Sequence, residues 1–137
     1  MPKKVLFVCI ENSNRSQIAE AFARIHGGYR IEAYSAGSKP SGKINPKAIS
    51  SMKELDYDLH THHSKSLDDI PDIQYDAVVT MGCGDACPWI AADLREDWDI
   101  PDPRDMNEKD FTKVRYTIEE KVKVLISKLV RSDMARK

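Results

Sequence analysis

The arrangement of apolar and polar positions along the chain predicts a sheet whose strands alternate with helices. Residues 5–8 form a continuous apolar run, which is typical of a strand covered on both faces in a parallel sheet. Further strands are predicted at 29–35 and 75–81, and a short fourth strand at 98–100. This alternation indicates an α/β fold with a parallel sheet, in which ligands bind beyond the carboxyl ends of the strands.

Three helices are predicted between and after these strands. In the first, apolar residues recur at spacings of four and three from Ile18, and the glycine pair at 27–28 ends the pattern. The second begins at Asn45, a capping residue followed by Pro46 at the first helical position. The third is the most regular, with an apolar stripe made of Phe111, Val114, Ile118, Val122, Leu125 and Leu129.

Composition and charge argue against several classes of function. The chain has 137 residues with 21 basic and 22 acidic side chains, so no global field recruits nucleic acid or an anionic membrane. No segment reads as a signal peptide or a membrane span. Three cysteines are too few for a secreted disulfide framework and fit thiols kept reduced in the cytoplasm. We therefore expect one domain over residues 1–137, a cytoplasmic monomer without a cofactor, nucleic-acid partner or membrane contact.

Cys9 stands where the first predicted strand ends and a polar loop begins. The loop leads to Arg15, which opens the first helix, so its backbone N–H groups and the positive helix N-terminus form a cradle for a tetrahedral oxyanion. Arg15 adds a planar, bidentate donor for the same anion. This field also favours the thiolate form of a cysteine, and the hydroxyl of Ser16 is available to donate to the sulfur. The alternative is that Cys9 is a small buried residue that closes the strand.

Four segments together resemble the low-molecular-weight protein tyrosine phosphatase family, and within it the arsenate reductase branch. They are VLFVCIENSNRSQIAEAF at 5–22, SAG at 35–37, VVTMGC at 78–83 and the Asp-Pro pair at 102–103. The resemblance implies an α/β three-layer sandwich with a four-stranded parallel sheet in the order 2-1-3-4 and helices on both faces.

The resemblance also implies roles for individual residues. Cys9 is the nucleophile, and Asp102 is the general acid that protonates the leaving oxygen. The residues themselves leave Asp102 open between this role and that of a turn aspartate before proline. Glu11 departs from the small or neutral residue that such loops often carry, and would repel an anion if it pointed inward. The oxyanion is bound by the loop residues Ile10, Glu11, Asn12, Ser13, Asn14 and Arg15.

The other two cysteines separate a reductase from a phosphatase. Reducing arsenate takes two electrons, which a pair of thiols supplies by forming a disulfide. We expect Cys9 to bond arsenic, Cys83 to attack the Cys9 sulfur and expel arsenite, and Cys87 to attack Cys83 in turn. Thioredoxin or a similar dithiol then reduces the final disulfide. Only three residues separate Cys83 from Cys87, which keeps glutaredoxin and mycothiol-type donors open.

Two alternative functions remain. A phosphatase acting on phosphotyrosine would by resemblance carry an aromatic pair after the Asp-Pro pair, where this chain has Arg104 and Asp105. A non-catalytic zinc module could use the two later cysteines with the histidines at 60–63. Exposed histidines are the simpler expectation in that polar stretch, so no metal site is predicted.

The resemblance further implies a potassium ion beside the loop. Asn12, Glu20 and Ser35 match three of its ligands in the family, whereas Lys65 stands where the family has an aspartate. A lysine ammonium is a compact cation with three donors, so Lys65 either takes the place of the ion or points into solvent.

Overall fold

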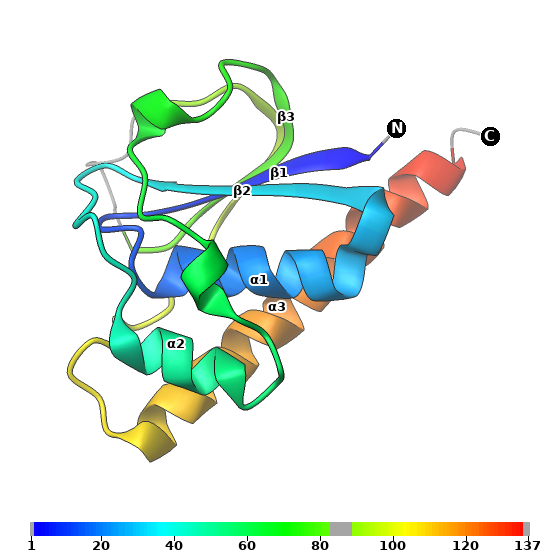
Figure 1. Ribbon diagram of the computed structural model, residues 1–137. Coiled ribbons are helices and arrows are strands. Elements are labelled where there is room, and N and C mark those ends of the chain that lie inside the picture. The colour runs from blue at the N-terminus through cyan, green and yellow to red at the C-terminus, as the bar shows by residue number, and fades with distance from the viewer. Residues whose placement is uncertain (1, 83–88, 136–137) are drawn as a thin grey trace.

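The computed structural model describes residues 2–82 and 89–135, and its centre is a parallel sheet (Figure 1). The strands lie in the order β2-β1-β3-β4, and every pairing is parallel. This confirms the fold class and the strand order expected from the sequence. The strands are β1 (Lys3–Cys9), β2 (Ile31–Gly37), β3 (Tyr75–Thr80) and β4 (Ala92–Asp97).

Three α-helices pack together beneath one face of the sheet (Figure 1). They are α1 (Arg15–Gly27), α2 (Pro46–Lys53) and α3 (Glu108–Ala135). The cap predicted at Asn45 is present, because its side chain accepts a hydrogen bond from the backbone N–H of Lys47. None of the helices in the described part of the chain is both long and apolar enough to cross a membrane.

Short 3-10 helices fill the connections: η1 (Gly28–Arg30), η2 (Leu59–Thr61) and η3 (Leu67–Asp69). The last of them, with the segment that follows it, covers the sheet face opposite the α-helices (Figure 1). There Leu67 and Ile70 pack against a small apolar cluster that contains Leu6 and Val8 of β1. The central strand is therefore buried on both faces, as its continuous apolar run predicts.

The fourth strand is not where the sequence predicts it. It comprises Ala92–Asp97, whereas residues 98–100 lie outside any strand. Trp98 and Ile100 are buried because they join the main core beyond the end of the strand, not because they extend it. The second strand also begins two residues later than predicted, since η1 occupies Gly28–Arg30.

Candidate active site

Cys9 is the last residue of β1, and its side chain is buried at the edge where the parallel strands end. The loop that follows turns sharply, with Asn12 at a φ of 51°. Asparagine tolerates this left-handed conformation better than most residues. Gly37 packs so closely on the loop that an added Cβ would overlap the carbonyl of Ile10, which explains the glycine of the Ser-Ala-Gly segment.

A chain of hydrogen bonds fixes the surroundings of the Cys9 sulfur. The Sγ atom lies 2.8 Å from the hydroxyl of Ser16, which in turn lies 2.8 Å from the side-chain nitrogen of Asn12. The backbone N–H of Lys65 donates to Oδ1 of Asn12 at 2.8 Å. A backbone N–H can only donate, so the Asn12 oxygen faces Lys65 and its NH₂ group faces Ser16. The Ser16 proton is thereby left for the sulfur.

Arg15 is held in place by the segment that carries Asp102. Its Nη1 donates to the carbonyl of Ile100 at 3.0 Å, and its Nη2 lies 4.0 Å from a carboxylate oxygen of Asp102. Gly82, at a φ of 75°, lies directly against the guanidinium, where an added Cβ would overlap Nη1. The predicted oxyanion-binding arginine and the predicted general acid are therefore brought together.

A pocket of about 280 Å³ opens over Cys9. Two of its lining residues, Lys39 and Arg104, were not predicted, because single basic residues in loops carry no sequence signal of their own. Asn12 is fully buried and does not line the pocket, so it supports the loop from behind. The predicted residues that line the pocket are Cys9, Ile10, Glu11, Ser13, Asn14, Arg15 and Asp102.

The pocket mouth carries an ion pair and a further cation. Nη2 of Arg104 lies 3.4 Å from a carboxylate oxygen of Glu11, and both side chains are partly exposed. Glu11 thus has a cationic partner, which reduces the repulsion that an unpaired carboxylate would exert on an anion. Lys39 lines the same pocket and adds a second positive charge.

Behind the loop lies a buried polar cluster that the sequence did not reveal. Nε2 of Gln17 donates to the backbone carbonyls of Asn12 at 3.0 Å and His63 at 2.8 Å, so its Oε1 is an acceptor. That oxygen lies 2.9 Å from Nδ1 of His62, which must therefore carry a proton. Nε2 of the same ring lies 2.6 Å from the hydroxyl of Tyr57. Burial lowers the pKa of His62, which favours the neutral ring that accepts from Tyr57.

This finding corrects the expectation that the histidines at 60–63 are all exposed. His62 is only 8% exposed, and both of its ring nitrogens are engaged. Within residues 2–82 and 89–135, no group of three or more His, Cys, Asp or Glu side chains could hold a metal ion. Cys83 and Cys87, on which the zinc alternative and the thiol relay both depend, lie outside the described residues.

The residues around Glu20 do not fit a potassium ion. The hydroxyl of Ser35 donates to Glu20 at 2.6 Å, and Nζ of Lys65 lies 3.9 Å from the same carboxylate oxygen. Nζ of Lys65 also donates to the carbonyl of His63 at 2.8 Å. Oδ1 of Asn12 already accepts from Gln17 and from the Lys65 backbone. Two cationic groups therefore lie next to Glu20: the ammonium of Lys65 near one carboxylate oxygen, and the guanidinium of Arg24, which donates to the other at 3.0 Å.

Comparison with known proteins places this site in a family. The model of the family described as low molecular weight phosphotyrosine protein phosphatase matches residues 4–135. The chain belongs to this family.

Several similar family members have names that mention arsenate. The glutaredoxin arsenate reductase of Synechocystis sp. is 37% identical over 130 residues, which cover 93% of this chain and 98% of that protein. A solved structure of an arsenate reductase in the phosphate-binding state has a TM-score of 0.85 at 37% identity, covering 93% of this chain and 98% of that one. A thioredoxin-dependent arsenate reductase of Corynebacterium glutamicum has a TM-score of 0.79 at 29% identity, covering 96% and 63% respectively.

Proposed function

We propose that this chain reduces arsenate to arsenite. One observation carries the proposal: the sulfur of Cys9, the guanidinium of Arg15 and the carboxyl of Asp102 meet at one small polar pocket. The similar proteins named as arsenate reductases give the substrate class, since arsenate is a tetrahedral oxyanion that such a pocket suits.

In the first step the Cys9 thiolate attacks the arsenic atom. A sulfur–arsenic bond forms and an arsenic–oxygen bond breaks, and the leaving hydroxyl group of hydrogen arsenate takes a proton from Asp102 and departs as water. Arg15 and the loop N–H groups stabilise the oxygens that remain on arsenic. The Ser16 hydroxyl stabilises the thiolate before the attack.

The second half of the reaction uses Cys83 and Cys87. The Cys83 thiolate attacks the Cys9 sulfur, and the electron pair of the sulfur–arsenic bond leaves with arsenic, which becomes arsenite. Cys87 then attacks Cys83, so the Cys9 thiolate is released and a Cys83–Cys87 disulfide remains. Support comes from Gly82, which contacts Arg15 and is followed directly by Cys83 in the sequence.

An external dithiol or thiol must reduce the final disulfide. The names of similar proteins mention both glutaredoxin and thioredoxin, and we propose thioredoxin or a similar dithiol for this chain. The cytoplasm, where such reductants are maintained, is the compartment we propose.

The test is a turnover assay with arsenate and a reduced thioredoxin or glutaredoxin system, run beside hydrolysis of p-nitrophenyl phosphate. We expect arsenate reduction with little ester hydrolysis. Cys9→Ser should abolish both activities, whereas Cys83→Ser and Cys87→Ser should stop reduction and spare hydrolysis. Efficient ester hydrolysis without arsenate reduction would instead assign the chain to the phosphatase alternative. Repeated turnover by the Cys87→Ser variant would refute the three-thiol relay.

A further inference from the structure

Asp102 is exposed and lies in a segment without regular structure, between β4 and α3, in which the neighbouring Pro103 is buried. Within the segment, the backbone N–H of Arg104 donates to Oδ1 of Asp102 at 3.1 Å, and that of Met106 donates to the carbonyl of Pro103 at 3.0 Å. These bonds shape a local turn, but they do not fix where the turn lies relative to Cys9. Contacts from other parts of the chain must do that.

One end of the segment is tied to the oxyanion loop by Arg15, which donates to the carbonyl of Ile100. The other end is tied by Lys47 of α2. Its Nζ donates to the carbonyl of Arg104 at 3.0 Å and to that of Met106 at 2.9 Å. Hydrogen bonds from an ammonium are stronger than neutral ones. Lys47 thus adds a further attachment to those made by the buried Pro103 and by the ion pair of Arg104 with Glu11.

Lys47 is itself connected to the oxyanion loop. The backbone N–H of Asn45 donates to the carbonyl of Ser13 at 3.1 Å, and the side chain of Asn45 accepts from the backbone N–H of Lys47 at 2.8 Å. A continuous path of hydrogen bonds therefore runs from the loop that binds the anion, through the first turn of α2, to the segment that carries the acid.

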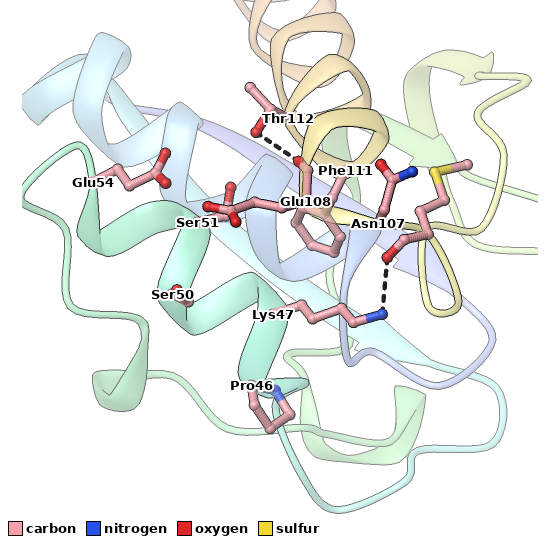
Figure 2. Close-up of a pocket in the computed structure, with 10 residues that line it drawn as sticks. Pro46, Lys47, Ser50, Ser51, Glu54, Asn107, Glu108, Phe111 and Thr112 are labelled. Carbon is pink, nitrogen blue, oxygen red and sulfur yellow. Dashed lines mark hydrogen bonds between the residues drawn. The ribbon is translucent and has the colours of Figure 1, made fainter.

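The direction of the Lys47 side chain supports a role in this segment. Figure 2 shows it reaching away from Glu54 and toward the chain that precedes α3, along a cavity of about 420 Å³ between α2 and α3. Both hydrogen-bond acceptors recorded for its ammonium are backbone carbonyls of this segment. A surface lysine without a structural role would extend into solvent, whereas the Lys47 ammonium donates to two carbonyls of one turn.

We propose that Lys47 is a positioning residue that holds the Asp102 carboxyl in its working place above Cys9. This rests on the proposed function, in which Asp102 protonates the leaving oxygen. Lys47 does not line the pocket over Cys9, so its loss leaves the anion contacts of Arg15 and the loop in place. The effect therefore falls on kcat and not on KM for arsenate.

The test compares Lys47→Met with Lys53→Met. Lys53 is exposed on the same helix, so the second variant makes the same charge change without touching the segment. We expect Lys47→Met to lower kcat about fivefold with KM within about twofold, as for the loss of one net hydrogen-bonding contact. Lys47→Arg should recover most of the rate. The double variant Lys47→Met with Asp102→Asn should be no slower than Asp102→Asn alone.

A second readout does not need activity. Hydrogen exchange of the Arg104 and Met106 amides should accelerate in Lys47→Met and stay unchanged in Lys53→Met. Equal kcat in the two lysine variants, additive losses in the double variant, or unchanged exchange at both amides would each overturn the proposal. If the wild-type protein did not reduce arsenate, the proposed function would fail, and the exchange data alone would decide whether Lys47 holds the segment.

Discussion

The hydroxyl oxygen of Ser16 lies 2.8 Å from the sulfur of Cys9. The NH₂ group of Asn12 donates to the same oxygen, which leaves the Ser16 proton available to a Cys9 thiolate, because a thiolate can only accept. Asn12 cannot turn its amide around, since the backbone N–H of Lys65 holds its oxygen. The hydroxyl beside the Cys9 sulfur is thus oriented by Asn12, which is held in turn by the backbone of Lys65.

Replacing Ser16 with alanine should therefore remove a hydrogen bond to the Cys9 sulfur and slow the first step, in which that sulfur attacks. A hydrogen bond to a charged acceptor is worth about 1.5 kcal/mol, so we expect alkylation of Cys9 by iodoacetamide near neutral pH to slow about tenfold. Alkylation would be followed on Cys9 by mass spectrometry of the digested protein. Ser127→Ala, on the exposed side of α3, is the matched control and should react like the wild type. An unchanged rate in Ser16→Ala would show that the hydroxyl does not act on the sulfur.

Gly82 and Gly42 offer a controlled pair of substitutions. Both have a positive φ, 75° and 81° respectively, so alanine strains the backbone at either position. Only at Gly82 does the added methyl group meet the guanidinium of Arg15, while the space at Gly42 is open. We expect Gly82→Ala to weaken binding of arsenate or sulfate roughly tenfold and Gly42→Ala to leave it unchanged, as measured by isothermal titration calorimetry. Equal affinities in the two variants would mean that the Arg15 side chain can move away from the added methyl group without weakening its contact with the anion.

His62 should make the free energy of unfolding depend on pH. Burial lowers its pKa below the ordinary value of 6.5; the carboxylate of Glu20 opposes this shift, and the positive charges of Arg24 and Lys65 add to it. Below 6.5 the unfolded chain binds a proton that the folded chain resists, so stability is complete above that pH and is lost as the pH falls. The free energy of unfolding, measured with urea at several pH values between about 5 and 7, should change less with pH in His62→Gln than in the wild type. An equal change of the free energy of unfolding with pH in the two proteins would exclude this role for His62.

Most of the fold could be predicted because the central strands and the long helix carry strong periodic signals. The strand β4 could not, because it is an edge strand whose residues alternate between partly buried and exposed, with Leu94 as its main apolar contact. The large apolar residues that follow, Trp98 and Ile100, gave a stronger signal although they only cover the end of the sheet. A run of apolar residues indicates that a segment is buried, and an edge strand can form with few buried residues.

The candidate site shows the same division. The loop from Cys9 to Ser16 could be proposed as a site because it is a short motif whose chemistry depends on local order in the sequence. Asp102 could be proposed as its partner only from the family resemblance. The support behind them was not, since Gln17 and His62 are 45 residues apart and meet only in the folded chain. His62 stands in a polar stretch without periodicity, so nothing in its neighbours indicates that it is buried.

Lys65 gives the last prediction, which concerns the dependence on potassium. Its ammonium lies 3.9 Å from Glu20 and is partly buried, and burial lowers the pKa of Lys65 while the Glu20 carboxylate raises it. An oxygen-binding monovalent cation would have to share Glu20 with this positive charge, which like-charge repulsion disfavours. We therefore expect the rate of arsenate turnover and the Tm to be equal in potassium and sodium salts at one ionic strength.

Lys65→Asp should reverse this behaviour. It removes the ammonium and adds a carboxylate next to Glu20, Ser35 and the Asn12 loop, and two neighbouring carboxylates need a cation to offset their repulsion. The variant should be less stable than the wild type in sodium and should regain stability and rate in potassium. Lys43→Asp, an exposed position with the same change of charge, should show no preference between the two salts. A wild-type protein whose Tm rises selectively with potassium would contradict the assignment of Lys65 as the resident cation.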